Sequence, residues 1–327
     1  MDYLDRIGLE HPVVQAGMGG GVVRAELAGA VSAAGALGTI GILPPALFRA
    51  ELQRARERAP GRPVAANLLV PFTRTAHVRG CVEAGAALVV FHGGLGRRWF
   101  AALRDARIPV FCTVGSLAQA RAAVAAGADG LVVQGVEAGG HLMGAEPLDA
   151  LLPKVRDLGA NLPVLAAGGI AESADVARVL DAGAAAAVAG TRFLLTDESR
   201  AHPEYKRRVA AATQTLRTTL FGFGWPLAHR VVPNAATDRW CGPDGDPPRW
   251  LRWTERASGP ASRVLPVSAG AFLAARQRVS LPLFGPALPL RGMPDAAVER
   301  TALYAGETVG KISDIVPACE AVERLTK

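Results

Sequence analysis

One arrangement of apolar residues recurs four times within residues 1–190: Ala-Gly-Ala, a short apolar run, then glycine. The copies are AAGALGTIG at 33–41, EAGAALVVFHGG at 83–94, AAGADGLVVQG at 125–135 and DAGAAAAVAG at 181–190. Each copy ends a helical pattern with glycine, the residue that best adopts the left-handed conformation at a helix C-terminus. The apolar run that follows is typical of a strand buried on both faces, so the repeat predicts helix–strand units of a parallel sheet.

Further apolar runs before and between these copies contain the pair Pro-Val, and proline is tolerated at the first residue of a strand. The pattern predicts eight strands, at 12–16, 37–41, 63–69, 87–91, 108–113, 129–134, 163–167 and 185–189. Helices are predicted between them, at 24–34, 45–58, 74–84, 97–106, 116–126, 148–158 and 172–182. Eight such units in about 190 residues favour an α/β fold of the (β/α)8 or TIM barrel type.

The alternative for alternating strands and helices is a doubly wound Rossmann sheet. That fold expects the motif G-x-G-x-x-G directly after its first strand. Here AGMGGGVV follows the first predicted strand, and Val22 stands where the motif requires its last glycine. The sequence therefore favours the barrel.

The pattern changes after residue 200. Residues 201–220 are predicted to be helical, and the chain beyond them is rich in proline, glycine and tryptophan. We expect 201–292 to form a helical and irregular cap near the mouth of a barrel built by 1–200. The segment 293–327 would complete the barrel, with closing helices predicted at 294–305 and 308–326.

Composition narrows the class of protein. Half of the 327 residues are hydrophobic, which is typical of a globular, enzyme-sized chain. There is no signal-peptide pattern at the N-terminus and no apolar run long enough to span a membrane, so we expect a cytoplasmic protein. The cysteines at 81, 112, 241 and 319 form no CxxC pair and predict free thiols, with no metal site and no disulfide framework.

The net charge of +7 raises the question of nucleic-acid binding. The arginines are spread along the whole chain and aromatic residues make up only 6% of it, which disfavours that class. A solvated basic face explains the densest cluster, YKRRVA at 205–210, and attraction of an anionic substrate or cofactor phosphate is the alternative. We therefore expect a small-molecule substrate as the partner, and neither nucleic acid nor a membrane.

In a barrel of this type, chemistry takes place on the loops at the carboxyl ends of the strands. Gly168 and Gly169 follow the seventh predicted strand, and Gly190 and Thr191 follow the eighth. Glycines let backbone N–H groups approach a phosphate closely, and the threonine hydroxyl can donate to it. A phosphate site between these two loops is our interpretation, and tight turns that need glycine are the alternative.

Other strand ends carry carboxamides. Asn67 and Gln134 offer donors and acceptors together, which suits the edge of a planar heterocycle such as a flavin pyrimidine. Bonding to the backbone of neighbouring loops is the alternative role for both. Met18 and Gly19, in GMGG after the first strand, would let a ring lie flat against the backbone.

A single histidine, His141, lies in the glycine-rich loop VVQGVEAGGHLMG at 132–144. Imidazole suits proton removal at neutral pH, and the other candidate bases near this mouth are His92 and Tyr3. Capping a turn is the alternative role for His141. Ala138 and Gly139 of the same loop complete the predicted cofactor-binding set.

At these residues the sequence resembles the nitronate monooxygenases, formerly called 2-nitropropane dioxygenases. The phrases that carry the resemblance are HPVVQAGMGG at 11–20, AELAGAVSAAGALGTIG at 25–41, VVQGVEAGGHLMG at 132–144, the stretch 163–199 and LYAGETVGKISDI at 303–315. The resemblance spans most of the chain and is weakest over 225–292.

The resemblance implies a barrel that binds FMN without covalent attachment and oxidises alkyl nitronates with O2 to nitrite and a carbonyl compound. Met18 and Gly19 would border the flavin ring, and Asn67 and Gln134 would contact it. Gly169, Gly190 and Thr191 would hold the phosphate. His141 would deprotonate a neutral nitroalkane, or would orient and stabilise a nitronate that is already an anion.

Two residues depart from the family pattern. Thr113 stands where some members have a lysine, and His92 stands where a less ionisable residue is expected. An alternative function is that of an FMN-dependent enoyl-acyl-carrier-protein reductase that uses NAD(P)H. A flavin-binding protein without turnover is the other, and a homodimer is left open.

Overall fold

Eight parallel strands form a closed barrel in the computed structural model, which describes residues 7–158, 162–259 and 276–327. Neighbouring strands follow the order β1-β9-β8-β6-β5-β4-β3-β2, and β1 meets β2 through backbone hydrogen bonds at 2.9 Å between Leu37 and both Val13 and Gln15. The strands are β1 Val13–Gln15, β2 Gly38–Ile40, β3 Val64–Leu69, β4 Val89–His92, β5 Val110–Val114, β6 Gly130–Gln134, β8 Val164–Ala167 and β9 Ala186–Ala189. The predicted TIM barrel is confirmed.

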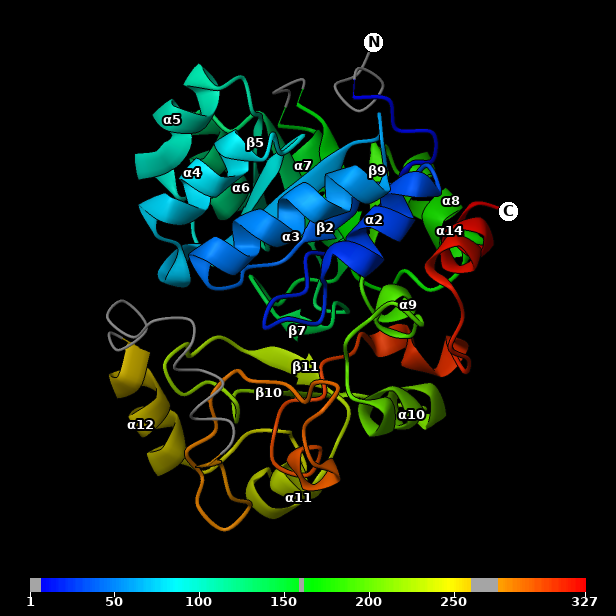
Figure 1. Ribbon diagram of the computed structural model, residues 1–327. Helices are drawn as coiled ribbons and strands as arrows, with labels where there is room; N and C mark the ends of the chain where they lie inside the picture. The colour runs from blue at the N-terminus through cyan, green and yellow to red at the C-terminus, as the bar shows by residue number, and fades with distance from the viewer. Residues whose placement is uncertain (1–6, 159–161, 260–275) are drawn as a thin grey trace.

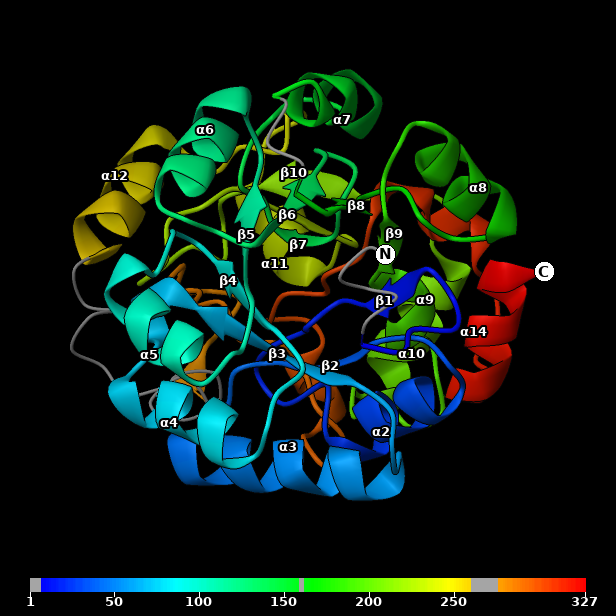
Figure 2. The ribbon, with the colours of Figure 1, turned by 90° about the horizontal axis from the view of Figure 1, so that it is seen from above.

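Helices surround the barrel in a ring (Figure 2). They are α2 Ala25–Ala33, α3 Pro45–Arg58, α4 Thr75–Glu83, α5 Phe100–Asp105, α6 Leu117–Ala125, α7 Leu148–Arg156, α8 Ser173–Asp181 and the short α9 Thr191–Leu194. The last helix, α14 (Ala318–Thr326), packs against both α2 and α8 and fills the outer layer there. Among the described residues, no helix is both long and apolar enough to cross a membrane.

The barrel interior is packed with side chains. Buried residues from alternating strand positions form one cluster, which includes Val14, Leu37, Ala65, Leu88, Phe111, Val132, Leu165 and Ala186. Gly130 on β6 makes room for the ring of Phe111, because a Cβ there would lie 2.4 Å from Phe111 Cζ. The ring therefore fills space that a larger residue on β6 would occupy, and the chemistry is left to the ends of the strands.

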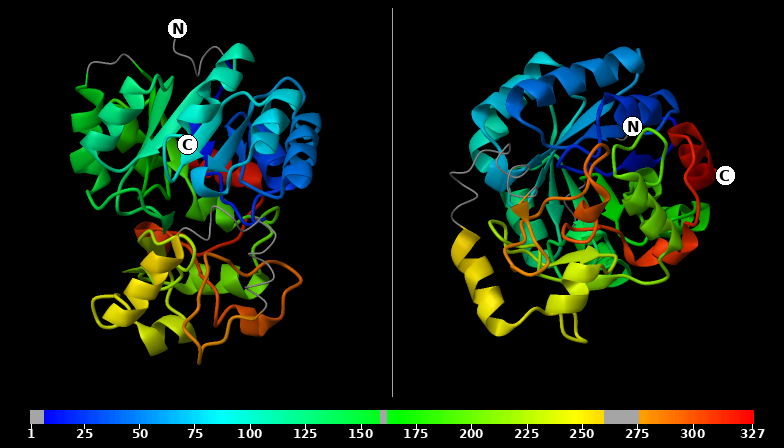
Figure 3. Two further views of the ribbon diagram at one scale, coloured as in Figure 1. Left: turned by 90° about the vertical axis from the view of Figure 1, so that its left-hand side faces the viewer. Right: turned by 60° about the horizontal axis from the view of Figure 1, so that its bottom comes forward.

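A second, three-stranded sheet lies below the carboxyl ends of the barrel strands (Figure 1). It consists of β10 (Leu216–Thr218), β11 (His229–Val231) and β7 (Gly140–His141), all antiparallel. Since β7 belongs to the loop after β6, this sheet joins the predicted cap to the barrel. Figure 3 shows the same two layers from the side, with α11 (Ala235–Trp240) and α12 (Arg249–Ser258) in the lower one.

The helices expected after residue 200 differ from the observed ones. The predicted helix 201–220 ends early, as α10 Pro203–Ala211, because Leu216–Thr218 pairs with β11 instead. Of the predicted helix 294–305 only a 3₁₀ turn at Asp295–Ala297 forms. Residues 308–326 divide into a 3₁₀ helix, η5 (Glu307–Lys311), and α14. The predicted cap 201–292 includes 260–275, which lie outside the described residues, and its role as a cap stays a proposal.

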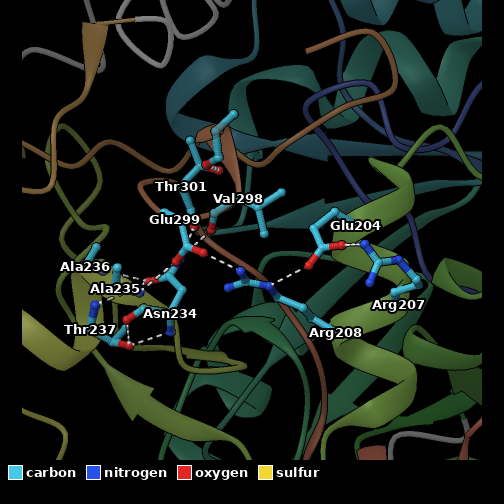
Figure 4. Close-up of polar contacts among 11 residues, drawn as sticks. Glu204, Arg207, Arg208, Asn234, Ala235, Ala236, Thr237, Val298, Glu299 and Thr301 are labelled. Atoms are coloured by element: carbon cyan, nitrogen blue, oxygen red, sulfur yellow. Dashed lines mark hydrogen bonds and ion pairs between the residues drawn. The ribbon is translucent and has the colours of Figure 1, made fainter. Parts of the chain in front are cut away.

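An ion-pair network fixes the chain after residue 294 to the cap (Figure 4). Arg208 on α10 pairs with both Glu204 and Glu299. The other carboxylate oxygen of Glu299 accepts a hydrogen bond of 3.1 Å from the backbone N–H of Ala235, at the start of α11. The guanidinium of Arg208 lowers the pKa of the Glu299 carboxyl, so the pair stays charged at neutral pH. These contacts accompany a series of turns at 298–301, where a helix was expected.

Asn234 makes the central contact of this region. Its side-chain oxygen caps α11 by accepting from the N–H groups of Ala236 and Thr237, at 3.2 and 3.3 Å. Its side-chain nitrogen donates to the carbonyl oxygens of Val298 and Thr301, both at 2.8 Å. One buried amide therefore satisfies groups from two segments that are far apart in sequence (Figure 4).

We expect Asn234→Ala to lower the free energy of unfolding by about 1–3 kcal/mol, since it removes a helix cap and leaves buried carbonyls without donors. Urea unfolding followed by circular dichroism measures this. Asn234→Ser keeps the cap but loses the donations to 298 and 301, and should show an intermediate loss. An alanine variant as stable as the native chain would contradict this account of the cap.

Candidate active site

Two glycine loops meet at the carboxyl ends of the neighbouring strands β8 and β9. Gly168 and Gly169 have φ angles of 121° and 71°, a region that favours glycine. A Cβ at Gly168 would lie 3.2 Å from the backbone nitrogen of Ala138. At Gly190 the space is open, since among the described residues a Cβ would meet only Ala16 within 4 Å. The structure thus brings the predicted glycines together with Ala138.

The segment AGETVG at 305–310 forms a third side of this region. The backbone N–H of Gly306 donates to the hydroxyl of Thr191 at 2.9 Å. A Cβ at Gly139 would lie 2.6 Å from the carbonyl carbon of Ala305, so Gly139 allows two backbones to pack closely. Gly306 was not among the site residues predicted from the sequence. The sequence feature that could have indicated Gly306 is its place in LYAGETVGKISDI, one of the phrases that carry the family resemblance.

A carboxylate also lies near these glycines. An Oε2 atom of Glu137 is 3.5 Å from a Cβ built at Gly168. Both Glu137 carboxylate oxygens accept from the backbone N–H of Leu148, at 3.0 and 3.2 Å, at the N-terminus of α7. The helix N-terminus carries partial positive charge and compensates part of the carboxylate charge. Glu137 therefore repels an anion bound beside Gly168 less strongly than its short distance from Gly168 alone suggests.

Asn67 and Met18 lie at the ends of β3 and β1. The Asn67 side-chain nitrogen donates to the carbonyl oxygen of Gly17 at 2.9 Å, and its side-chain oxygen accepts no bond from a described residue. Gly17 is required there, because a Cβ would lie 2.2 Å from Asn67 Cβ. Met18 is half-buried, and Gly19 follows it with its Cβ position 3.5 Å from Ile42. Asn67 thus keeps an acceptor for a ligand.

Gln134 holds the loop that carries His141. Its side-chain nitrogen donates to the carbonyl oxygen of His141 at 3.1 Å, and its side-chain oxygen accepts from the N–H of Met143 at 2.8 Å. Of the two roles considered from sequence, bonding to the loop backbone is the one that the structure displays. One N–H of the Gln134 amide is not used in these bonds.

His141 lies in a buried cluster of rings. Its imidazole stacks on the indole of Trp225, with ring centroids 3.9 Å apart and planes 19° apart. The rings of His229 and Tyr304 lie 5.1 and 5.4 Å away. The Nε2 atom is buried and has no hydrogen-bond partner among the described residues. Burial, and then the nearby His229 and His92, hold the pKa of His141 well below its usual value, so the ring is neutral at pH 7.

Two more histidines flank His141. His92, at the end of β4, bonds to the backbone of His141, and burial lowers its pKa to about 4 despite this bond. His229 is the register partner of His141 in the second sheet. Its Nδ1 donates to the carbonyl oxygen of Leu227 at 3.0 Å, and its Nε2 accepts from the N–H of Phe221 at 3.2 Å. Both nitrogens of His229 are therefore used, which fixes one neutral tautomer. Tyr3 lies outside the described residues.

His229, Trp225 and Tyr304 were not predicted as site residues from the sequence. All three belong to the chain after residue 200, where the strand pattern that marked the other site residues is absent. The pairing of β11 with β7 brings them to the barrel mouth. The aromatic and histidine content of FGFGWPLAHR at 221–230 was the available signal.

The buried histidines predict a pH dependence of stability. Burial lowers the pKa values of His92 and His229 to about 4 in the fold, whereas unfolded histidine titrates near 6.5. Below pH 6.5 the unfolded chain therefore binds more protons than the folded one. The free energy of unfolding should fall as the pH drops from about 6.5 to about 4, by about 1.4 kcal/mol per pH unit for each group.

His229→Gln removes one of these groups and should make the decline shallower within that window. Urea unfolding at a series of pH values, for the native chain and the variant, measures both slopes. Parallel profiles across the window would contradict the assignment of a neutral, buried His229.

The barrel, with polar and ring-bearing residues gathered at the carboxyl ends of its strands, defines the class of the protein as a TIM-barrel enzyme. A family model described as nitronate monooxygenase matches residues 3–224. The chain belongs to the nitronate monooxygenase family.

Named relatives include more than one kind of enzyme. The chain is 31% identical, over 98% of its length and 93% of the relative's, to "(3aS,4S,5R,7aS)-5-hydroxy-7a-methyl-1-oxo-octahydro-1H-indene-4-carboxyl-CoA dehydrogenase" of Mycobacterium tuberculosis. Among solved structures it is similar to FabK from Thermotoga maritima, with a TM-score of 0.77 and 27% identity over 98% of this chain and 93% of that one. It is equally similar to nitroalkane oxidase from Streptomyces ansochromogenes, with a TM-score of 0.75 and 29% identity over 99% and 96%.

Proposed function

We propose that this chain is an FMN-dependent monooxygenase that oxidises alkyl nitronates with O2 to a carbonyl compound and nitrite. The observation that carries the proposal is the buried Nε2 of His141, which has no hydrogen-bond partner among the described residues, at the mouth of a barrel of this family. A buried polar atom without a partner is costly, so it indicates a place where a ligand completes the hydrogen bonding.

The residues at the strand ends fit FMN. Gly168, Gly169 and Gly190 leave backbone free of side chains, and together with Thr191 they would hold the phosphate. Asn67 would contact the flavin ring through its unused acceptor, and Gln134 through its remaining N–H.

Ring contacts come from neighbouring backbone. Met18 and Gly19 would border the flavin ring, and Ala138 and Gly139 would line the cofactor site beside the phosphate loops. Bound FMN supplies the acceptor for the electrons that leave the substrate.

The chain's own contribution is to position the substrate and move a proton. A neutral nitroalkane would give its proton to Nε2 of the His141 ring, which is neutral at pH 7 because burial disfavours the charged form. A nitronate brings a negative charge that favours a positive partner, so the same ring would instead stabilise the anion. His92 holds the His141 backbone, and Trp225 covers the ring and excludes water.

His141→Asn tests the role of the imidazole. It should keep the flavin but lose about 10²–10⁴-fold in turnover of neutral nitroalkanes, the usual worth of a general base. Turnover of a preformed nitronate should fall less, since no proton must be removed. Steady-state oxygen uptake with both substrates measures this, and His11→Asn, before β1 and away from the barrel mouth, is the control. Equal losses on both substrates would contradict a base.

Gly190→Leu tests the phosphate site. The backbone there has φ −109°, which any residue adopts, so the variant should fold. Its side chain would fill the space open beside Gly190, and FMN content after purification should drop strongly, while Gly190→Ala should show a smaller drop. Absorbance of the released flavin measures both, and normal FMN occupancy in the leucine variant would contradict the placement.

A second candidate is an FMN oxidoreductase that acts on an acyl thioester, for example an enoyl-acyl-carrier-protein reductase that uses NAD(P)H. The similarity of nearly the whole chain to a carboxyl-CoA dehydrogenase and to FabK favours it. Anaerobic mixing with NADH separates the two: the monooxygenase should keep its oxidised flavin spectrum, and rapid bleaching would favour the second candidate.

A further inference from the structure

A cleft of about 810 Å³ opens beside the candidate active site, on the side of β4 and β5. Its lining comes from the loop before α4, the glycines after β4, the end of β5, the start of α6 and the loop 224–227. Its inner wall includes Met143, two residues after His141, and Trp225, which stacks on the His141 ring. The cleft therefore borders the site where the reacting group would lie.

The charged residues that line this cleft all carry positive charge. They are Arg74, before α4, and Arg98, in the 3₁₀ helix Arg97–Trp99; the other described lining residues are uncharged. The guanidinium of Arg98 lies 4.0 Å above the ring of Trp99 and forms no ion pair with a described residue. Stacking uses the face of the guanidinium and leaves the N–H groups at its edge for an anion.

The rest of the cleft lining is uncharged, and hydrogen bonds brace part of it. Gln119 accepts from the N–H of Gly115 at 2.8 Å and donates to the carbonyl oxygen of Met143 at 2.9 Å, so its amide braces the wall. Gly115 and Gly144 pack so closely that a Cβ at Gly144 would lie 1.8 Å from the Gly115 oxygen. Leu95 and Pro226 line the same space.

We propose that this cleft binds the phosphate-bearing arm of a substrate of the phosphopantetheine thioester class, with Arg74 and Arg98 on the phosphate and the neutral arm along Met143 and Trp225. This rests on the second candidate function given above, an FMN oxidoreductase that acts on an acyl thioester at the His141 site. A cleft of this volume lies in the range that holds drug-sized ligands, far more than a short-chain nitronate requires.

The chemistry of the walls selects the ligand. Two arginines on different elements suit a group with several acceptor oxygens, and phosphate offers them in more directions than a carboxylate. The uncharged wall suits a neutral chain between that phosphate and the reacting end. Coenzyme A carries this arm on a nucleotide, and a carrier protein carries it on a serine.

Isothermal titration calorimetry on the FMN-loaded protein tests the proposal, with coenzyme A, pantetheine and ADP as probes. Coenzyme A should bind with a lower Kd than pantetheine, which has the arm without phosphate, and than ADP, which has phosphate without the arm. Arg98→Ala should weaken coenzyme A binding by about 10- to 100-fold, the usual worth of a hydrogen bond to a charged group. Arg97→Ala, the adjacent arginine that does not line the cleft, should leave the Kd unchanged.

Equal affinity for pantetheine and coenzyme A would overturn the role of the arginines. Equal affinity for ADP and coenzyme A would show that the cleft is a general anion site and would overturn the proposal that it binds the pantetheine arm. Binding of a holo-acyl-carrier protein without binding of coenzyme A would overturn coenzyme A as the source of the phosphopantetheine arm. Because calorimetry needs no turnover, loss of coenzyme A binding with intact nitronate oxidation would reject the cleft alone, whereas protein without FMN would reject the function.

Discussion

The pairing of β7 with β11 is the constraint on which the site depends. Gly140 pairs with Arg230 and His141 with His229, and the N–H of Leu142 donates to the carbonyl oxygen of Ala228 at 2.8 Å. These bonds order a glycine-rich loop and offset part of the backbone entropy that the loop loses on folding. They also bring Trp225 onto the His141 ring, so the chain after residue 200 sets the environment of the candidate base.

That environment is buried and uncharged. Three histidines meet there, and burial keeps each of them neutral at pH 7, because a charged imidazole is costly in a medium of low polarity. Only His141 has a buried ring nitrogen without a partner among the described residues, whereas both nitrogens of His229 are bonded. An anionic substrate or a transferred proton would thus act most strongly on His141. The same low polarity strengthens the interaction that results.

The barrel could be predicted from sequence because its signals are local. Each strand is a short apolar run bounded by glycine or Pro-Val, and the predicted strand at 129–134 appears as Gly130–Gln134. The second sheet could not be predicted in this way, since the three-residue strand Leu216–Thr218 is defined only by its partner β11. The helix predicted at 294–305 was wrong for the same reason: long-range contacts with Asn234 and Glu299 fix that segment as a series of turns.

The same contrast between local and long-range signals applies to the candidate site residues. Gly168, Gly190 and His141 follow barrel strands, so their positions alone made them candidate site residues. Gln134 was also identified, but its partners were not, because the sequence gives no sign that the loop folds back onto it. Trp225 and His229 come from the cap, whose contacts with the barrel leave no periodic signal.

The most direct test of the central claim is the absorbance spectrum of the purified protein before and after a nitronate is added without oxygen. The account predicts a yellow protein whose oxidised flavin spectrum disappears on addition of the nitronate and returns when O2 is admitted. An oxidised flavin spectrum that the nitronate leaves unchanged would contradict it.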